Sequence, residues 1–193
     1  MCDLIVMSEE IEYIVHGELI NGHILINDGK AIDELSKKGY GDKEGKKHLL
    51  KIYEALYLLF NNKITVKYKN KILEFDQLVN TSLKNDDEAW TRFLVYRDLR
   101  SRGYIVKEGF GFGVDFRVYE RGDYGSKPAK YVVFGINEGI EMKLENLNSI
   151  TEQIAHMGKE PVIAVIERRG EVIYYKVSRM RFLNNKNSSD TNL

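Results

Sequence analysis

The stretch LVYRDLRSRGYIVKEGFGFGVDFRVYERG (residues 94–122) carries most of the information about the fold. It opens inside a helix that we expect over residues 87–102 and that Gly103 ends. Two strand-like runs follow, at residues 104–107 and 114–119, and the glycine-rich GFGFG segment between them is typical of a turn. The second half of the chain is therefore expected to begin with a helix and a β-hairpin.

The remainder of the second half alternates strand signals with one further helix. We expect the helix over residues 148–157, and strands over residues 130–136, 161–167 and 172–177. The run 162–166 is almost wholly apolar, as in a strand that is covered on both faces. These elements indicate a mixed sheet flanked by helices.

The first half is expected to be a smaller mixed unit. Its strongest pattern lies at residues 47–61, where apolar residues recur at helical spacing and predict one amphipathic helix. Short strands are expected at 13–17, 23–26 and 64–68, and short helices at 31–38 and 75–83. The segment GYGDKEGKK (39–47) is expected to be a loop.

The fold class expected from these patterns is α/β with two domains. Residues 1–85 would form an α+β N-terminal domain, and residues 86–183 a C-terminal domain with a mixed sheet between helices. Residues 184–193 are polar and poor in apolar side chains, which predicts a disordered tail.

Composition limits the functions that the chain can have. Its 193 residues include one cysteine, Cys2, so an intramolecular disulfide or a cysteine-rich zinc site is excluded. No apolar run approaches the length of a membrane span, and a signal peptide is not evident, so a cytoplasmic protein is expected. The formal net charge is zero. Because nucleic-acid binding relies on basic side chains, any RNA surface must be a local patch or belong to a partner.

Three separated blocks of the chain resemble the tRNA-splicing endonucleases of archaea and eukaryotes. They are the opening stretch 94–122, the segment IAHMGKEPVIAVIERRGEVIYYKV (154–177), and GYG (39–41) followed by EALYLL (54–59). The resemblance implies metal-free and cofactor-free cleavage of precursor tRNA at introns, giving 2′,3′-cyclic phosphate and 5′-hydroxyl ends. It also implies three catalytic groups: a tyrosine as general base, a histidine as general acid and a lysine that stabilises the transition state.

This chain keeps only part of that set. The tyrosine position falls on Tyr119 and the lysine position on Lys159, but the histidine position is Pro128, which has no proton to give. An arginine of the family that sandwiches a base is replaced by Glu152, which cannot make a cation–π contact. Ser149 and Glu152 could instead form a capping box at a helix start.

Some members of this family are heterotetramers of two catalytic and two supporting subunits. A supporting subunit keeps the fold and lacks the full catalytic set, which is the pattern seen here. We therefore expect a structural subunit, inactive alone, whose partners are a catalytic subunit and precursor tRNA. The strand 172–177 would be a pairing edge. The loop ERRGE (167–171), acidic in the family, carries Arg168 and Arg169 here, which puts the usual docking in doubt.

Other interpretations remain open from the sequence. The chain could cleave RNA by itself with a substitute acid such as His156, or it could be a family member that only binds RNA. A pattern of acidic residues and a lysine would alternatively suit a Mg²⁺-dependent nuclease; its members are Asp115, Glu141 and Lys143. Phosphate contacts could come from either of two basic clusters, which are Lys43, Lys46 and Lys47, and Arg97, Arg100 and Arg102.

Overall fold

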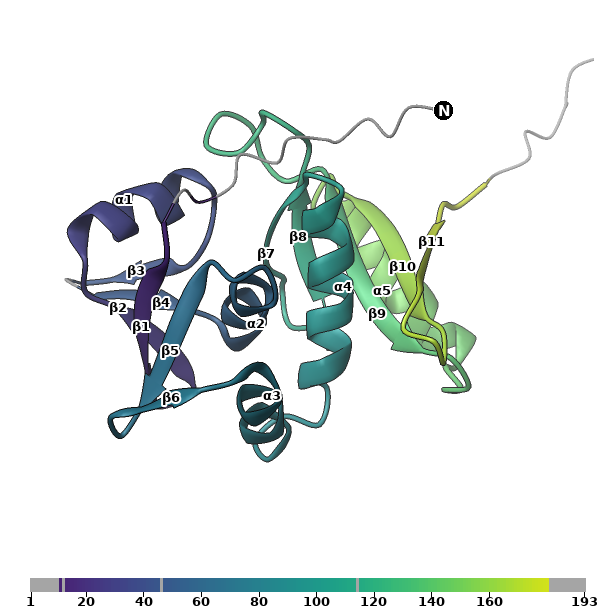
Figure 1. Cartoon of the computed structure of the whole chain (residues 1–193). Helices are drawn as coiled ribbons and strands as arrows, with labels where there is room; N and C mark the ends of the chain where they lie inside the picture. Colours follow the sequence, from purple (N-terminus) through teal and green to yellow (C-terminus); the bar gives the residue numbers. More distant parts are fainter. Residues whose placement is uncertain (1–10, 12, 46, 114, 181–193) are drawn as a thin grey trace, which may run out of the picture.

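The computed structural model describes residues 11, 13–45, 47–113 and 115–180. Within these residues the chain forms two mixed sheets and five helices, which confirms the expected α/β class (Figure 1). The predicted tail at 184–193 lies outside the described residues, and the boundary at residue 85 stays a prediction. In the described part of the chain, no helix is long and apolar enough to cross a membrane.

The N-terminal sheet has six strands in the order β3-β4-β2-β1-β5-β6. All pairs are antiparallel except β1 with β5, which is parallel. The bounds are β1 Val15–Ile20, β2 His23–Ile26, α1 Gly29–Lys37, β3 Asp42–Glu44, β4 Lys47–Leu50, α2 Ile52–Phe60, β5 Ile64–Tyr68, β6 Lys71–Leu73 and α3 Phe75–Leu83.

Two expectations for this domain were wrong. The single helix expected at 47–61 is a strand, β4, followed by the shorter helix α2, because His48 and Leu50 point into the core while β4 pairs with β2. The segment 39–47 was expected to be a loop but contains β3, which pairs with β4. The first error arises because β4 pairs with β2, which is distant in sequence and therefore absent from a local pattern. The second arises because β3 consists of three exposed charged residues and shows no apolar alternation.

The C-terminal sheet has five strands in the order β11-β10-β9-β8-β7, with only β9 and β10 parallel. One face packs against α4, and the other packs against α5 (Figure 1). The bounds are α4 Ala89–Ser101, β7 Ile105–Glu108, β8 Asp115–Tyr119, β9 Tyr131–Asn137, α5 Leu144–His156, β10 Glu160–Ile166 and β11 Val172–Lys176. Helix α5 begins before the expected residue 148, so Ser149 is inside the helix and the capping box was a wrong interpretation.

A buried polar cluster ties the two domains together around the turn at residues 39–42. Lys107 of β7 donates from Nζ to the Gly41 carbonyl at 2.7 Å and to Asp42 Oδ1 at 3.0 Å. Glu54 of α2 accepts the Gly41 N–H at 3.0 Å and the Lys51 N–H at 2.8 Å. Its carboxylate also lies 3.9 Å from Lys107 Nζ.

Arg100 adds the second domain-spanning contact. Its guanidinium donates to the Lys38 carbonyl at 3.1 Å and lies 4.0 Å from the ring centroid of Tyr40. Such a cation–π contact is worth more when it is shielded from water. Arg100 and Tyr40 are both buried, so this contact is shielded from water and joins the two domains directly.

His48 makes this cluster sensitive to acid. The ring is 1% exposed, its Nε2 donates to the Tyr40 carbonyl at 3.0 Å, and its Nδ1 has no hydrogen-bond partner among the described residues. Burial lowers the pKa of His48, and Lys107 and Lys43 act in the same direction, while the Tyr40 carbonyl and Asp42 oppose them. The folded protein therefore holds His48 neutral at a pH where the unfolded chain binds a proton.

We expect the free energy of unfolding to fall as the pH drops below about 6.5, where the unfolded His48 takes up a proton. Urea denaturation of the wild type and of His48→Gln between pH 8 and pH 5 measures this. Glutamine can still donate to the Tyr40 carbonyl but does not titrate, so the wild type should lose more stability than the variant.

Glu54 changes the pH dependence in the opposite direction. Burial raises its pKa against the effects of Lys107 and two N–H donors, so acid relieves the cost of its buried charge. This contribution is common to both proteins and cancels in the difference. Parallel pH profiles for wild type and His48→Gln would contradict the prediction.

Candidate functional site

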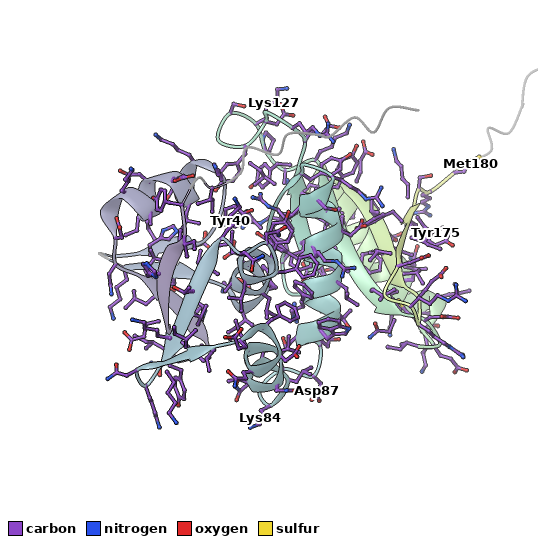
Figure 2. All side chains as sticks on the ribbon, viewed as in Figure 1. Tyr40, Lys84, Asp87, Lys127, Tyr175 and Met180 are labelled. Carbon is purple, nitrogen blue, oxygen red and sulfur yellow. The ribbon has the colours of Figure 1, made fainter. Side chains whose placement is uncertain are left out.

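Three positions predicted from the sequence lie at one end of the C-terminal sheet, where strands finish or begin. They are Tyr119, Pro128 and Lys159. Strand β8 ends at Tyr119, and the neighbouring strands β9 and β10 begin at Tyr131 and Glu160. Because β8 runs antiparallel to β9, while β9 and β10 are parallel, the end of β8 and the starts of β9 and β10 lie at the same end of the sheet. The loop between β8 and β9 extends beyond this end of the sheet and carries Lys127 (Figures 1 and 2).

Lys159 is fixed against the segment that contains Pro128. Its Nζ donates to the Ala129 carbonyl at 3.0 Å, and the side chain is half-buried. The backbone continues this connection, because Lys130 N–H donates to the Val118 carbonyl and Glu160 N–H donates to the Lys130 carbonyl. The lysine position and the histidine position of the resemblance are therefore neighbours in the fold.

Tyr119 is half-buried at the end of β8. Its ring meets the ring of Tyr124 edge-on, with 5.1 Å between the centroids. Tyr124 in turn lies over Gly39, where an added Cβ would come 3.4 Å from its ring. Within the described part of the chain, the Tyr119 hydroxyl has no hydrogen bond. The β8–β9 loop thus rests on the N-terminal domain and holds Tyr119 from one side.

The side chains around Pro128 are fixed as ion pairs. Lys130 Nζ lies 2.6 Å from Glu120 Oε1, which also accepts the Tyr131 hydroxyl at 3.1 Å. These hydrogen bonds lower the pKa of Glu120 and raise the pKa of Lys130. On the loop, Lys127 pairs with Asp123 at 2.8 Å, which raises the pKa of Lys127. The pKa shifts of Glu120, Lys127 and Lys130 all favour the charged form, so none of these three side chains is adjusted to give a proton near neutral pH.

Sequence reasoning missed this network of Glu120, Lys130 and Tyr131. Glu120 and Tyr131 lie eleven positions apart and no motif connects them. Only the register of β8 with β9, which pairs Val118 with Tyr131, brings them together.

His156, the candidate substitute acid, lies in the last turn of α5 and is exposed. Its side chain makes no hydrogen bond to any of the residues that the structure describes. Glu152 lies one helical turn before His156 in α5 and pairs with Arg179 at 3.0 Å. Among the described residues, neither side chain forms a hydrogen bond or ion pair with Tyr119 or Lys159.

The alternative metal site finds no geometric support. Asp115 is buried, and its two carboxylate oxygens accept backbone N–H groups from Phe110, Gly111 and Phe112. Glu141 and Lys143 are exposed in the segment before α5. Among the described residues, no group of three or more histidine, cysteine or acidic side chains could hold a metal ion. The role visible for Asp115 is to shape the glycine-rich loop.

The arginine cluster proposed for phosphate contacts is occupied by structural contacts. Arg100 is buried in the domain interface, and Arg97 donates to the Gly170 carbonyl at 3.3 Å. Arg102 pairs with Asp98 at 2.7 Å and lies 5.7 Å from the ring centroid of Tyr174. Each arginine of this cluster therefore has an internal partner, and Arg100 is buried, while contacts of Arg97 and Arg102 with phosphate stay a prediction. In the other cluster, Lys46 lies outside the described residues.

Comparisons with known proteins define the class of both domains. Residues 15–79 match the family model of the tRNA intron endonuclease N-terminal domain, and residues 89–174 match that of the tRNA intron endonuclease catalytic C-terminal domain. The first range contains the whole N-terminal sheet, and the second contains the C-terminal sheet except for the last two residues of β11.

Curated relatives agree over nearly the whole chain. A tRNA-splicing endonuclease of Methanococcus vannielii is 33% identical over 168 residues, which cover 86% of this chain and 95% of the relative. One of Pyrococcus horikoshii is 32% identical over 178 residues, covering 91% of this chain and 100% of the relative. The chain belongs to the tRNA-splicing endonuclease family.

Proposed function

We propose that this chain is a structural, non-catalytic subunit of a tRNA-splicing endonuclease. The observation that carries the proposal is the geometry around Pro128. The proline stands beside the Ala129 carbonyl that binds Lys159, at the position where the resemblance implies the general acid. Lys127 and Lys130, which flank Pro128 in the chain, are paired with Asp123 and Glu120. A subunit without a proton donor at this place loses roughly 10²–10⁴ in rate.

The exposed edge of the C-terminal sheet supports assembly with a partner subunit. Strand β11 is the outermost strand, and its Ile173 and Tyr175 are 39% and 52% exposed. Figure 2 shows Tyr175 standing out from this edge. An exposed edge with alternating apolar side chains suits pairing with a second sheet through main-chain hydrogen bonds. We propose that the partner is a catalytic subunit, in a heterotetramer of two plus two.

The test is cleavage of an intron-containing precursor tRNA in EDTA. We expect no product from this chain alone and product from its mixture with a catalytic subunit that carries the full tyrosine, histidine and lysine set. Tyr119→Phe in this chain should leave the activity of the mixture unchanged within about twofold, because the chain does not supply the base.

The matched control is tyrosine to phenylalanine at the corresponding position of the catalytic subunit, which should abolish product. Cleavage by this chain alone, lost on Tyr119→Phe, would overturn the proposal in favour of a self-sufficient enzyme. Cleavage restored by Mg²⁺ and absent in EDTA would instead support the metal-dependent alternative.

A further inference from the structure

Positive charge is concentrated in one hairpin of an otherwise neutral chain. The whole sequence has 29 basic and 29 acidic residues. The segment NNKITVKYKNKIL (residues 61–73) contains four lysines and no acidic residue. It forms β5, a tight turn and β6 at one edge of the N-terminal sheet. A neutral chain that binds a polyanion needs a local patch of this kind.

The hairpin has a defined shape. Tyr68 pairs with Lys71 across the turn, and Lys69 and Asn70 between them both have positive φ, 48° and 65°. Two successive positive φ values are what a two-residue type I′ turn requires, although lysine adopts them less readily than glycine. The turn therefore presents its side chains from a folded β-hairpin. Figure 1 shows this turn projecting at the opposite end of the molecule from the β8–β9 loop.

Three of these lysines are available to a ligand. Lys67, Lys69 and Lys71 are exposed, and none has an ion pair among the described residues. Register places Lys67 opposite Ile72 and Lys71 opposite Tyr68, so the two lysines project from different faces of the hairpin, with Lys69 at its tip. Many of the chain's other cations are fixed, as are Arg92, Arg100, Arg102, Lys107, Lys127 and Lys130.

An exposed aromatic ring lies among these cations. Tyr68 is 42% exposed, and Lys69 Nζ lies 5.3 Å from its ring centroid. Lysines that track a backbone and an aromatic face on which a base can stack are the two components of surfaces that bind unpaired nucleic acid. An acidic protein could pair with the lysines, but it has no base to stack on the Tyr68 ring. The combination therefore favours RNA as the ligand.

The opposite edge of the same sheet lacks these properties. There, Lys43 and Lys47 alternate with Asp42 and Glu44 along β3 and β4, so positive and negative charges are adjacent. Asp42 is also bound to Lys107. This edge has nearly balanced charge and provides an internal comparison.

We propose that the β5–β6 hairpin is a surface through which this chain binds RNA, with Lys67, Lys69 and Lys71 on phosphates and Tyr68 against a base. The inference rests on the proposed function and adds to it the site at which the supporting subunit holds precursor tRNA. The competing explanation is that lysines on a short edge strand only prevent sheets from joining edge to edge.

The test is the binding of a fluorescently labelled precursor tRNA to the full chain, measured by anisotropy at several salt concentrations. The variant Lys67→Gln/Lys69→Gln/Lys71→Gln should bind at least about tenfold more weakly at low salt. Its plot of log affinity against log salt should lose about 2 to 3 units of slope, since each lost phosphate contact removes about 0.7–0.9. Tyr68→Leu should weaken binding with the slope unchanged.

The matched control is Lys30→Gln/Lys37→Gln/Lys84→Gln, which removes the same charge from exposed positions of the same domain that lie outside both proposed phosphate-binding clusters. It should bind nearly as the wild type does. Equal losses in both triple variants, no loss in the hairpin variant, or no binding by the wild-type chain would overturn the inference. Self-association of the hairpin variant with unchanged RNA affinity would show that the lysines protect the edge.

Failure of the hairpin inference can be distinguished from failure of the proposed function. If the wild-type chain supports cleavage in the mixture while the hairpin variant binds RNA normally, only the hairpin inference fails. If the hairpin variant loses RNA affinity while the wild-type chain cleaves RNA alone, the RNA surface stands and the non-catalytic role fails.

Discussion

Replacing Lys107 by methionine is expected to lower the free energy of unfolding by about 3–5 kcal/mol, the range for removing one partner of a buried ion pair. Lys107 is 5% exposed and its Nζ contacts the Gly41 carbonyl, Asp42 and Glu54. Methionine fills a similar volume but cannot donate a hydrogen bond. The Gly41 carbonyl would remain buried without this donor.

Glu54 accounts for most of the expected loss. It is 1% exposed, and without Lys107 its charge would keep only the N–H groups of Gly41 and Lys51. The double variant Lys107→Met/Glu54→Gln should therefore be more stable than Lys107→Met, because it removes the uncompensated charge. Urea denaturation of the three proteins at pH 7.5 measures both effects.

Lys130→Met provides the control for this experiment. Lys130 makes a shorter ion pair, 2.6 Å to Glu120, but both side chains are over 40% exposed. Exposed pairs contribute little, so this variant should be nearly as stable as the wild type. If Lys107→Met cost no more than Lys130→Met, the buried cluster would not be what holds the two domains together.

Gly109→Ala is the second substitution with a large expected effect, about 2–4 kcal/mol from steric clash and lost hydrogen bonds. A Cβ at Gly109 would lie 1.8 Å from Asp115 Oδ2, closer than real atoms approach. The carboxylate cannot move away without losing the N–H groups of Phe110, Gly111 and Phe112. This loop forms one wall of a cleft of about 1070 Å³ between the domains.

The control for the second prediction is Gly29→Ala at the start of α1, where nothing lies within 4 Å of an added Cβ. It should leave stability unchanged or raise it slightly, because alanine favours a helix over glycine. Thermal unfolding of both variants and of Asp115→Asn completes the set. A Gly109→Ala protein as stable as Gly29→Ala would contradict the assignment of Asp115 as the group that shapes the loop.

Local sequence predicted those elements whose signal is contained within a few residues. Helix α3 and strand β2 have the expected bounds. In the hairpin of β7 and β8, no strand end differs from its expected position by more than one residue. Gly103, with φ of 84°, ends α4 as expected. At β4 the apolar pattern was compatible with both a helix and a strand, and the helix predicted from it was wrong.

The site divides in the same way. The sequence by itself indicated the family, and it predicted that Pro128 and Glu152 stand where the resemblance implies a histidine and an arginine. It did not determine which charges are free. Arg97, Arg100 and Arg102 look like a cluster in the sequence, yet packing buries one and gives the others internal partners.

Only the tertiary structure placed Lys159 on the Ala129 carbonyl, joined Lys107 to Glu54, and left the lysines of the β5–β6 hairpin exposed. The physical reason is that a side chain's charge state, partners and exposure depend on residues that strand register and domain packing bring close. Lys107 and Gly41 are 66 residues apart in the chain, and Lys159 and Ala129 are 30 apart. Sequence spacing defines which chemistry is present, while the fold decides where that chemistry can act.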